Sequence, residues 1–353
     1  MVGKQRNFGL DVVRGISILL VLRAHRFSHQ YEWGLLGVQV FFVLSGFLIG
    51  QILIRDFSGG GDFTTVFRFW KRRWYRTLPL YYLILLLKIL FFGNPYGWKM
   101  LVYFFFLQAN FIGIDFFPVS WSLVVEEWFY IFLPIVTLVF CSKGINGKHF
   151  GGVLVFWTIF FLLARFFWNY FEKGLILYQF DCLLLGVLLA LCKVKFNKLY
   201  QFFNSPILLI VSVAGLFIMT TILGDISVVP VFSPFYRVFW YFITSLLILI
   251  AIPYVEQSTF INQKLAKIKS LNLFFTWTSI LTYAMYLIHT EVYMIYLPIP
   301  EFLNLVIHGI VLYGLSLLIY IFYEHPMMSL RDNLSLSHYL KTVKSFSLSK
   351  KAY

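Results

Sequence analysis

The chain has 353 residues, of which 60% are apolar, 21% are aromatic and only 12% are charged. This composition excludes a disordered chain, a collagen and a disulfide-stapled secreted domain, and it is atypical of soluble enzymes, in which about a quarter of the residues carry charge. Lys and Arg number 29 against 15 Asp and Glu, a net charge of +14, which we assign to the loops of a membrane protein and not to nucleic-acid binding.

Eleven apolar segments approach the length of about 20 residues that a helix needs to cross a hydrocarbon layer of ~30 Å. They lie near residues 8–25, 34–54, 77–92, 98–112, 120–140, 151–168, 174–192, 206–223, 235–254, 273–297 and 302–324. The sequence therefore predicts an all-α, polytopic membrane bundle over residues 1–328, followed by a polar cytoplasmic tail over residues 329–353. The three cysteines show no metal-ligand spacing, so we expect no metal site.

The distribution of Lys and Arg predicts how these segments cross the membrane. With a cytoplasmic N-terminus, and with residues 98–112 entering the membrane without crossing it, 21 of the 29 Lys and Arg fall in cytoplasmic segments and 4 in external ones. If all eleven segments crossed, the basic connection at residues 141–149 would lie outside, against the positive-inside rule. We therefore expect about ten transmembrane helices, one re-entrant or interfacial segment, and both termini in the cytoplasm.

The first span carries ionisable residues that are costly in a membrane, so each is a candidate site residue or half of an ion pair. Asp11 and Arg14 are three residues apart and close enough to pair; the pair could also merely hold this span to a neighbour. Arg14 and His25 lie within ~20° of one helix face and ~16 Å apart along the axis. His25 is either a hydrogen-bonded histidine at the outer interface or a general base.

A basic cluster precedes the third span. It consists of Arg68, Lys71, Arg72, Arg73 and Arg76. Such a cluster can be a topological signal and an anchor for lipid headgroups, or its guanidinium groups can clamp a phosphate.

A third polar group lies at the expected outer end of the span over residues 120–140, which begins with Trp121 and Ser122 and carries Glu126 and Glu127. Consecutive helix positions face ~100° apart, so at least one carboxylate must enter the bundle. A carboxylate beside His25 would fix the tautomer of its imidazole. On the span over residues 273–297, two further polar residues could join this pocket or form a local pair, namely His289 and Glu291.

Six stretches resemble, in order, the acyltransferase family 3 of polytopic membrane proteins, which modify cell-surface glycans and other acceptors. They are residues 10–15 running to His25, then 37–49, 72–79, 121–130, 283–289 and 323–326. Two positions depart from the pattern, because Gln39 stands where the family often has Asp, and His325 replaces a frequent Arg.

The resemblance implies a donor acyl-CoA, commonly acetyl-CoA, supplied from the cytoplasm, and an acceptor hydroxyl at the outer face of a bacterial inner membrane. It also implies that Arg14 acts with His25, and Arg73 with Arg76. The expected partners are membrane lipid, acyl-CoA and a glycan or lipid-linked glycan, and a homodimer is left open.

From the pattern of charged residues together with the family resemblance, we expect the coenzyme A phosphates to bind Arg73 and Arg76, with help from Arg72 and Lys71. A pantetheine arm of ~15–20 Å would pass Arg14 and deliver the thioester to His25, which Glu126 or Glu127 would orient as general base. We assign the rest of the substrate pocket to Asp11, Ser45, Trp121, Ser122, His289 and Glu291. This hypothesis requires the arginines and His25 to be two ends of one groove.

Two alternatives follow from the same residues. Ser45 or Ser122 could be the nucleophile of an acyl-enzyme route, although no Ser, Thr or Cys is placed beside His25 by spacing alone, which favours direct transfer. A transporter or flippase of a glycan intermediate would also use intramembrane charges. The absence of a visible inverted repeat in the sequence disfavours transport.

Overall fold

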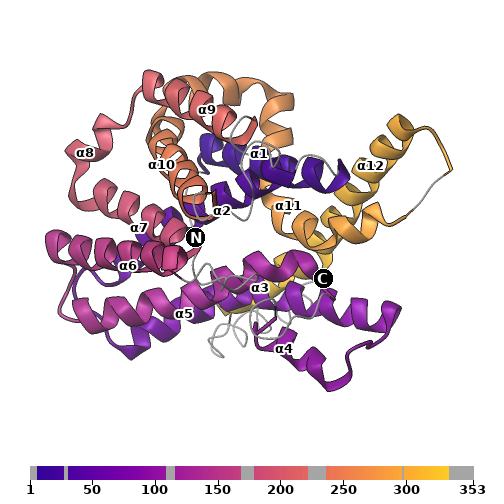
Figure 1. The fold of residues 1–353 in the computed structure, drawn as a ribbon, viewed down its shortest axis with the longest axis horizontal. Coiled ribbons are helices and arrows are strands. Elements are labelled where there is room, and N and C mark those ends of the chain that lie inside the picture. Colours follow the sequence, from indigo (N-terminus) through magenta and orange to yellow (C-terminus); the bar gives the residue numbers. More distant parts are fainter. Residues whose placement is uncertain are drawn as a thin grey trace, which may run out of the picture.

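The structure is a computed structural model, and it describes residues 6–27, 31–108, 116–167, 179–221, 236–295 and 298–333. Every regular element in these ranges is a helix (Figure 1). The longer helices are α1 (Phe8–Arg26), α2 (Tyr31–Asp56), α3 (Phe63–Phe92), α5 (Trp121–Cys141), α6 (Gly147–Phe167), α7 (Phe180–Lys195), α9 (Pro206–Thr221), α10 (Tyr241–Gln257), α11 (Lys269–Tyr293) and α12 (Glu301–Ile319). The shorter elements are η1 (Gly97–Met100), α4 (Leu101–Phe104), η2 (Pro118–Ser120), α8 (Asn197–Phe202), η4 (Tyr236–Trp240), η5 (Phe260–Lys264), η6 (Leu265–Lys267), η7 (Tyr320–Glu324) and α13 (His325–Asn333).

Seven helical stretches of the described chain are long and apolar enough to cross a membrane. Three more predicted spans fall short of that standard: α7 and α9 have only 16 residues each, and α1 is interrupted by Asp11, Arg14 and Arg23. An all-α polytopic membrane bundle is thus confirmed, whereas the number of about ten crossings stays a prediction.

Residues 97–108 include the short helices η1 and α4 and contact α3 inside the bundle. The amide of Gly61, just before α3, donates to the carbonyl of Ser142, just after α5, at 2.9 Å. The start of α3 and the end of α5 therefore lie on the same side of the bundle. The hydroxyls of Tyr81 and Tyr82 donate to the carbonyls of Tyr103 and Phe104, both at 2.9 Å. This contact lies ~15 Å inside the end of α3, at 1.5 Å per residue. The described part of the segment thus has backbone groups bonded inside protein, as a re-entrant segment requires. Residues 109–112 of the predicted segment lie outside the described residues, and its re-entrant or interfacial character stays a prediction.

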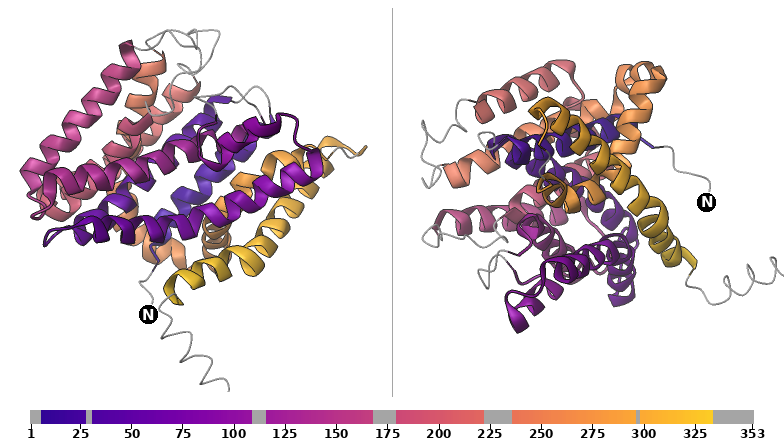
Figure 2. Two further views of the ribbon diagram at one scale, coloured as in Figure 1. Left: turned by 90° about the horizontal axis from the view of Figure 1, so that it is seen from below. Right: turned by 90° about the vertical axis from the view of Figure 1, so that its right-hand side faces the viewer.

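The connections predicted to be cytoplasmic lie together on one side. Lys193, near the end of α7, bonds Glu256, near the end of α10, at 2.6 Å between Nζ and Oε1. Asn7, before α1, donates to the carbonyl of the same Glu256 at 2.7 Å. In the left view of Figure 2, the start of α1 and the end of α13 also share a side. Which side faces the cytoplasm stays a prediction.

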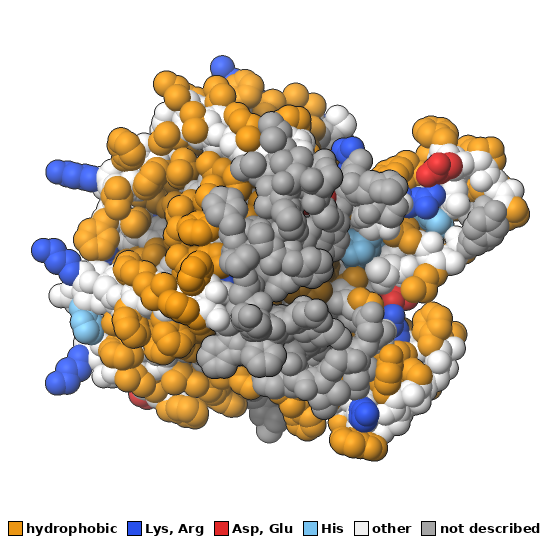
Figure 3. Space-filling model, viewed as in Figure 1, with side chains coloured by type: hydrophobic (Ala, Val, Ile, Leu, Met, Phe, Trp, Pro, Cys, Tyr) orange, Lys and Arg blue, Asp and Glu red, His pale blue; other side chains and the backbone are white. Residues whose placement is uncertain are grey.

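Helix α2 lies inside the bundle, between α1 and α7 (Figure 1). Its contact with α7 depends on two glycines, because a Cβ on Gly46 would lie 2.0 Å from the carbonyl oxygen of Leu183, and one on Gly186 would lie 2.1 Å from that of Val43. Small residues of this kind let membrane helices approach closely. Apolar side chains cover much of the face drawn in Figure 3, and Lys and Arg stand mostly at its edges, as expected of a surface in lipid.

Helix α3 begins at an N-cap formed by Asp62. Its carboxylate accepts hydrogen bonds from the Thr64 hydroxyl at 2.6 Å and from the amide and hydroxyl of Thr65, each at 3.0 Å. These bonds, that from Thr64 first, lower the pKa of Asp62 to about 2. The cap fixes where α3 starts. It thereby also determines on which face of the helix each arginine of the basic cluster lies.

Candidate functional site

A cavity of about 160 Å³ lies between α1, α2, α3, α5, α11 and η7. Three arginines and two carboxylates line it, together with hydroxyl groups that include those of two predicted serines. These residues are Arg14, Arg73, Arg76, Glu126, Glu324, Ser45 and Ser122. The structure thus brings the predicted cations of the first and third spans to one site.

The spacing along α3 separates the basic cluster into two faces. Arg73 and Arg76, three residues apart, line the cavity. Arg72 is rotated by ~100° from Arg73 and instead bonds Asp56 at the end of α2, with 3.0 Å between Nη1 and Oδ2 and with 42% of its side chain exposed. Lys71 does not line the cavity either. The prediction that Arg72 and Lys71 help to bind the cofactor is therefore not supported by the geometry, because the helix turns both away.

Contacts with α5 hold this part of α3 in place. The guanidinium carbon of Arg73 lies 5.6 Å from the ring centroid of Tyr130, whose hydroxyl is 3.0 Å from that of Ser45. The Thr77 hydroxyl donates to Glu127 Oε1 at 2.6 Å, and the Trp70 indole donates to the Tyr130 carbonyl at 2.8 Å. Glu127 thus orients α3, and through it the arginines.

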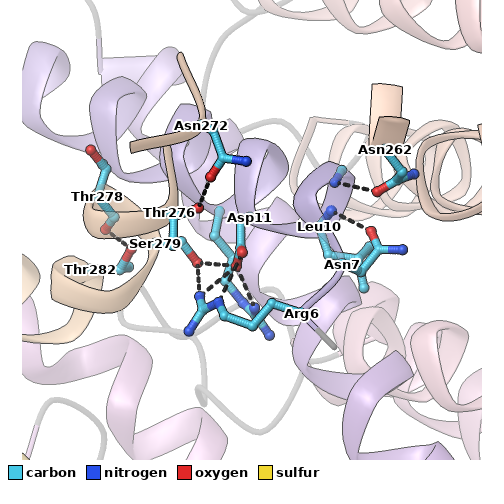
Figure 4. Close-up of polar contacts among 12 residues, drawn as sticks. Arg6, Asn7, Leu10, Asp11, Asn262, Asn272, Thr276, Thr278, Ser279 and Thr282 are labelled. Carbon is cyan, nitrogen blue, oxygen red and sulfur yellow. Dashed lines mark hydrogen bonds and ion pairs between the residues drawn. The ribbon is translucent and has the colours of Figure 1, made fainter. Parts of the chain in front are cut away.

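Asp11 holds Arg14 at the edge of the cavity without lining it. Its carboxylate accepts bonds from Arg6 at 2.6 and 3.0 Å and from the Ser279 hydroxyl at 2.7 Å, and it lies 3.6 Å from Arg14 Nη1. Figure 4 shows Arg6, Asp11 and Ser279 pointing toward one another between α1 and α11. Asp11 is only 2% exposed and lines neither cavity. Contrary to our assignment to the substrate pocket, it is therefore a positioning residue.

His25 lines a second, smaller cavity of about 60 Å³, which it shares with Trp121. Its exposed imidazole packs edge-to-face on His289, with 4.7 Å between ring centroids. Nδ1 of His25 lies 2.9 Å from the Val21 carbonyl, and Nδ1 of His289 lies 2.8 Å from the Tyr286 carbonyl. Because a carbonyl only accepts, each ring is assigned its hydrogen on Nδ1, so Nε2 of His25 keeps its lone pair for a proton.

His289 is fully buried, and its Nε2 has no hydrogen-bond partner among the described residues. Buried polar atoms without partners are rare and call for an explanation. His289 lines neither cavity, contrary to our assignment to the substrate pocket, and it packs behind His25 instead.

Neither Glu126 nor Glu127 contacts His25, contrary to our expectation. Glu126 lines the larger cavity, and Glu127 bonds Thr77. The physical reason is depth: Trp121 lies level with His25, whereas the two carboxylates follow it by five and six residues, or ~8–9 Å along the helix axis. We had expected Trp121, Glu126 and Glu127 all to lie at the depth of His25.

The two cavities are adjacent and are not one continuous groove. Val38 and Tyr286 line both. The Tyr286 hydroxyl donates to the Val119 carbonyl and bonds the Ser122 hydroxyl, both at 2.7 Å. The expected groove is thus divided by a partition that includes the side chains of Val38 and Tyr286, with the hydroxyl of Ser122 bonded to it.

Glu291 belongs to neither cavity, contrary to our assignment. It forms an ion pair with Lys88 of α3, which is only 7% exposed. The Lys88 Nζ also lies 5.0 Å from the ring centroid of Phe117. Glu291 therefore binds α11 to α3.

Two residues of the family-like stretches take unexpected roles. Gln39 is fully buried and bonds Gln179 at 2.8 Å and Ser245 at 3.2 Å, so this departure from the family pattern serves packing between α2, α7 and α10. Glu324 lines the larger cavity, and its Oε2 is buried without a partner in the described part of the chain. We had not predicted Glu324 as a site residue, although the stretch at residues 323–326 pointed to it.

Comparison with known proteins gives one family. A family model described as an acyltransferase domain, of acyltransferase family 3, matches residues 7–324. Peptidoglycan O-acetyltransferase OatA of Listeria monocytogenes is 30% identical over 158 residues, which cover 39% of this chain and 25% of OatA. YrhL of Bacillus subtilis, provisionally named a peptidoglycan O-acetyltransferase, is 32% identical over 151 residues, 37% of this chain and 24% of YrhL.

An O-acetyltransferase of Staphylococcus aureus (strain COL), so named provisionally, is 28% identical over 174 residues, 43% of this chain and 28% of the relative. The chain thus matches about a quarter of the length of these relatives. No solved structure matches the chain.

Proposed function

Because this chain belongs to acyltransferase family 3, we propose that it transfers an acetyl group from acetyl-CoA to a hydroxyl of a cell-surface or lipid-linked glycan, with His25 as general base. The donor binds from the cytoplasmic side and the acceptor from the outer side of the cytoplasmic membrane, with both termini in the cytoplasm. The names of OatA and YrhL favour a peptidoglycan hydroxyl as the acceptor.

The observation that carries this proposal is the convergence of Arg14, Arg73 and Arg76 on one cavity that adjoins the cavity of His25. Three guanidinium groups from two helices match the several negative charges of the coenzyme A phosphates, and each can form a forked, charge-assisted hydrogen bond. The pantetheine arm then extends toward Val38 and Tyr286, the residues common to both cavities.

The chemistry follows from the assigned tautomers. Nε2 of His25 removes the proton from the acceptor hydroxyl, whose oxygen attacks the thioester carbonyl carbon. A C–O bond forms, the C–S bond breaks, and coenzyme A leaves as a thiolate that takes up the proton from His25. The Tyr286 hydroxyl donates its one hydrogen to the Val119 carbonyl, so it accepts from Ser122. By turning its hydrogen from Tyr286 to the thioester, the Ser122 hydroxyl can donate to the carbonyl oxygen as negative charge develops on it.

Direct transfer is the route that the contacts favour. Ser45 lies 3.0 Å from the Tyr130 hydroxyl, and Ser122 lies 2.7 Å from that of Tyr286. Neither serine hydrogen-bonds an imidazole among the described residues, so neither has the base that an acyl-enzyme route requires.

A test of this function uses the purified protein with acetyl-CoA labelled in the acetyl group and a soluble peptidoglycan fragment as acceptor. We expect labelled ester to form, and we expect His25→Ala to lower the rate by about 10²–10⁴-fold, the usual contribution of a general base. His149→Ala is the matched control, because His149 is exposed at the start of α6, outside both cavities. Undiminished transfer by His25→Ala would exclude His25 as the base.

The alternative function, a transporter or flippase, predicts a different result. A transporter moves the glycan across vesicles without acetyl-CoA and forms no ester. Four charges inside the bundle are bound in two pairs that join neighbouring helices, Lys88 with Glu291 and Arg165 with Asp181. These pairs serve packing, which favours the enzyme.

A further inference from the structure

The cavity beside His25 combines one imidazole with small apolar walls. Its apolar lining comes from Ala24 of α1, from Gly34, Leu35 and Val38 of α2, and from Val119. Its volume is about 60 Å³, against about 150 Å³ for an engineered protein cavity that binds benzene. A glycan ring is too large for this space, whereas a short acyl group fits it.

We propose, resting on the function proposed above, that this cavity is the acyl subsite and that its walls restrict the donor to a two-carbon acyl group. An acetyl group has three heavy atoms beyond the sulfur, half as many as benzene. Its carbonyl carbon lies at the partition, within reach of Tyr286 and Ser122, and its methyl group points between Val38 and Leu35. Each further methylene of a longer donor meets the walls.

The walls cannot easily give way. A Cβ added to Gly34 would lie 2.7 Å from the Cβ of Ala24, so α1 and α2 are already in contact there. Leu35 is only 6% exposed and packs in a small apolar cluster with Met219 and Trp240. Protein interiors are close-packed, and inserting extra methylene groups forces side chains out of their preferred rotamers.

The fold places one residue so that its size controls both access and chain length. Val38 lines the larger and the smaller cavity, so the acyl group must pass it to reach His25. Replacing Val38 by Ala removes two methyl groups and so widens the passage between the two cavities. Leu35→Ala removes three carbons from a second wall and provides an independent enlargement.

The test is a competition in one tube between acetyl-CoA and propionyl-CoA, with products separated by mass. Only functional protein forms product, so the ratio of propionyl to acetyl ester does not depend on how much of a variant folds. Because one methylene in an apolar pocket changes specificity by about 10–200-fold, we expect the ratio to rise at least tenfold in Val38→Ala and in Leu35→Ala.

Val40→Ala is the matched control, since Val40 lies on the same helix and lines neither cavity. Its ratio should equal that of the wild type. A ratio that stays within twofold of the wild type in both enlarged variants would overturn the acyl subsite, as would an equal rise in Val40→Ala or wild-type use of butyryl-CoA as fast as acetyl-CoA. Each of these outcomes can be observed only if the wild type transfers acetyl groups. A failure of the proposed function is a different result, because no ester would then form from acetyl-CoA.

Discussion

The neighbours Arg72 and Arg73 should differ sharply in their importance for the donor, although both belong to one basic cluster. Arg73 lines the larger cavity, whereas Arg72 is 42% exposed and bonds Asp56 on the surface. A hydrogen bond to a charged group contributes about 1.5–3 kcal/mol, and each 1.4 kcal/mol is a factor of ten. Arg73→Ala should therefore lower kcat/KM for acetyl-CoA by about 10–150-fold.

Arg72→Ala should change the same quantity by less than about fivefold, because exposed ion pairs contribute 0–1 kcal/mol. The assay is the initial rate of acetyl ester formation at several acetyl-CoA concentrations, with the elution profile of each variant as a check of folding. Equal losses in the two variants would refute the assignment of separate faces, and would indicate that the cluster acts through its total charge.

Three further predictions concern groups outside the arginine cluster. Asp11→Asn, which removes the charge that holds Arg14 in place, should raise KM for acetyl-CoA by about tenfold, the effect of ~1.4 kcal/mol, with kcat little changed in steady-state kinetics; an unchanged KM would contradict this role. Ser122→Ala, which removes the hydroxyl that can donate to the thioester carbonyl oxygen, should lower kcat by about tenfold or more with KM unchanged, and an unaltered kcat would exclude that hydroxyl from the reaction. Lys88→Ala, which leaves Glu291 without its partner, should lower the stability by about 3 kcal/mol in thermal unfolding, and the loss should be smaller when Glu291→Leu is added.

Much of the fold could be predicted from the sequence because the membrane imposes simple rules. The length of the apolar runs identified most of the helices, and the asymmetry of Lys and Arg placed the start of α3 and the end of α5 on one side, as the hydrogen bond between Gly61 and Ser142 also does. Helix periodicity also explains why Arg73 and Arg76 share a face. The same periodicity could have separated Arg72 from them.

What could not be predicted depends on contacts between distant parts of the chain. The bond of Asp11 to Ser279 and the pair of Lys88 with Glu291 join segments whose relative depth and rotation no local pattern fixes. The partition between the cavities rests on Val38 and Tyr286, from two different helices. The expected contact of His25 with a carboxylate was wrong because residues of one motif were placed at one depth along α5.

The central hypothesis is that donor and acceptor react from opposite sides of the membrane, and vesicles with a single protein orientation test it most directly. Labelled acetyl-CoA is supplied only on the side of the connections at residues 57–62 and 142–146, and the peptidoglycan fragment only on the other side. We predict labelled ester on the acceptor side, and its loss in His25→Ala. Ester that forms only when donor and acceptor share one side would contradict transfer through the two cavities.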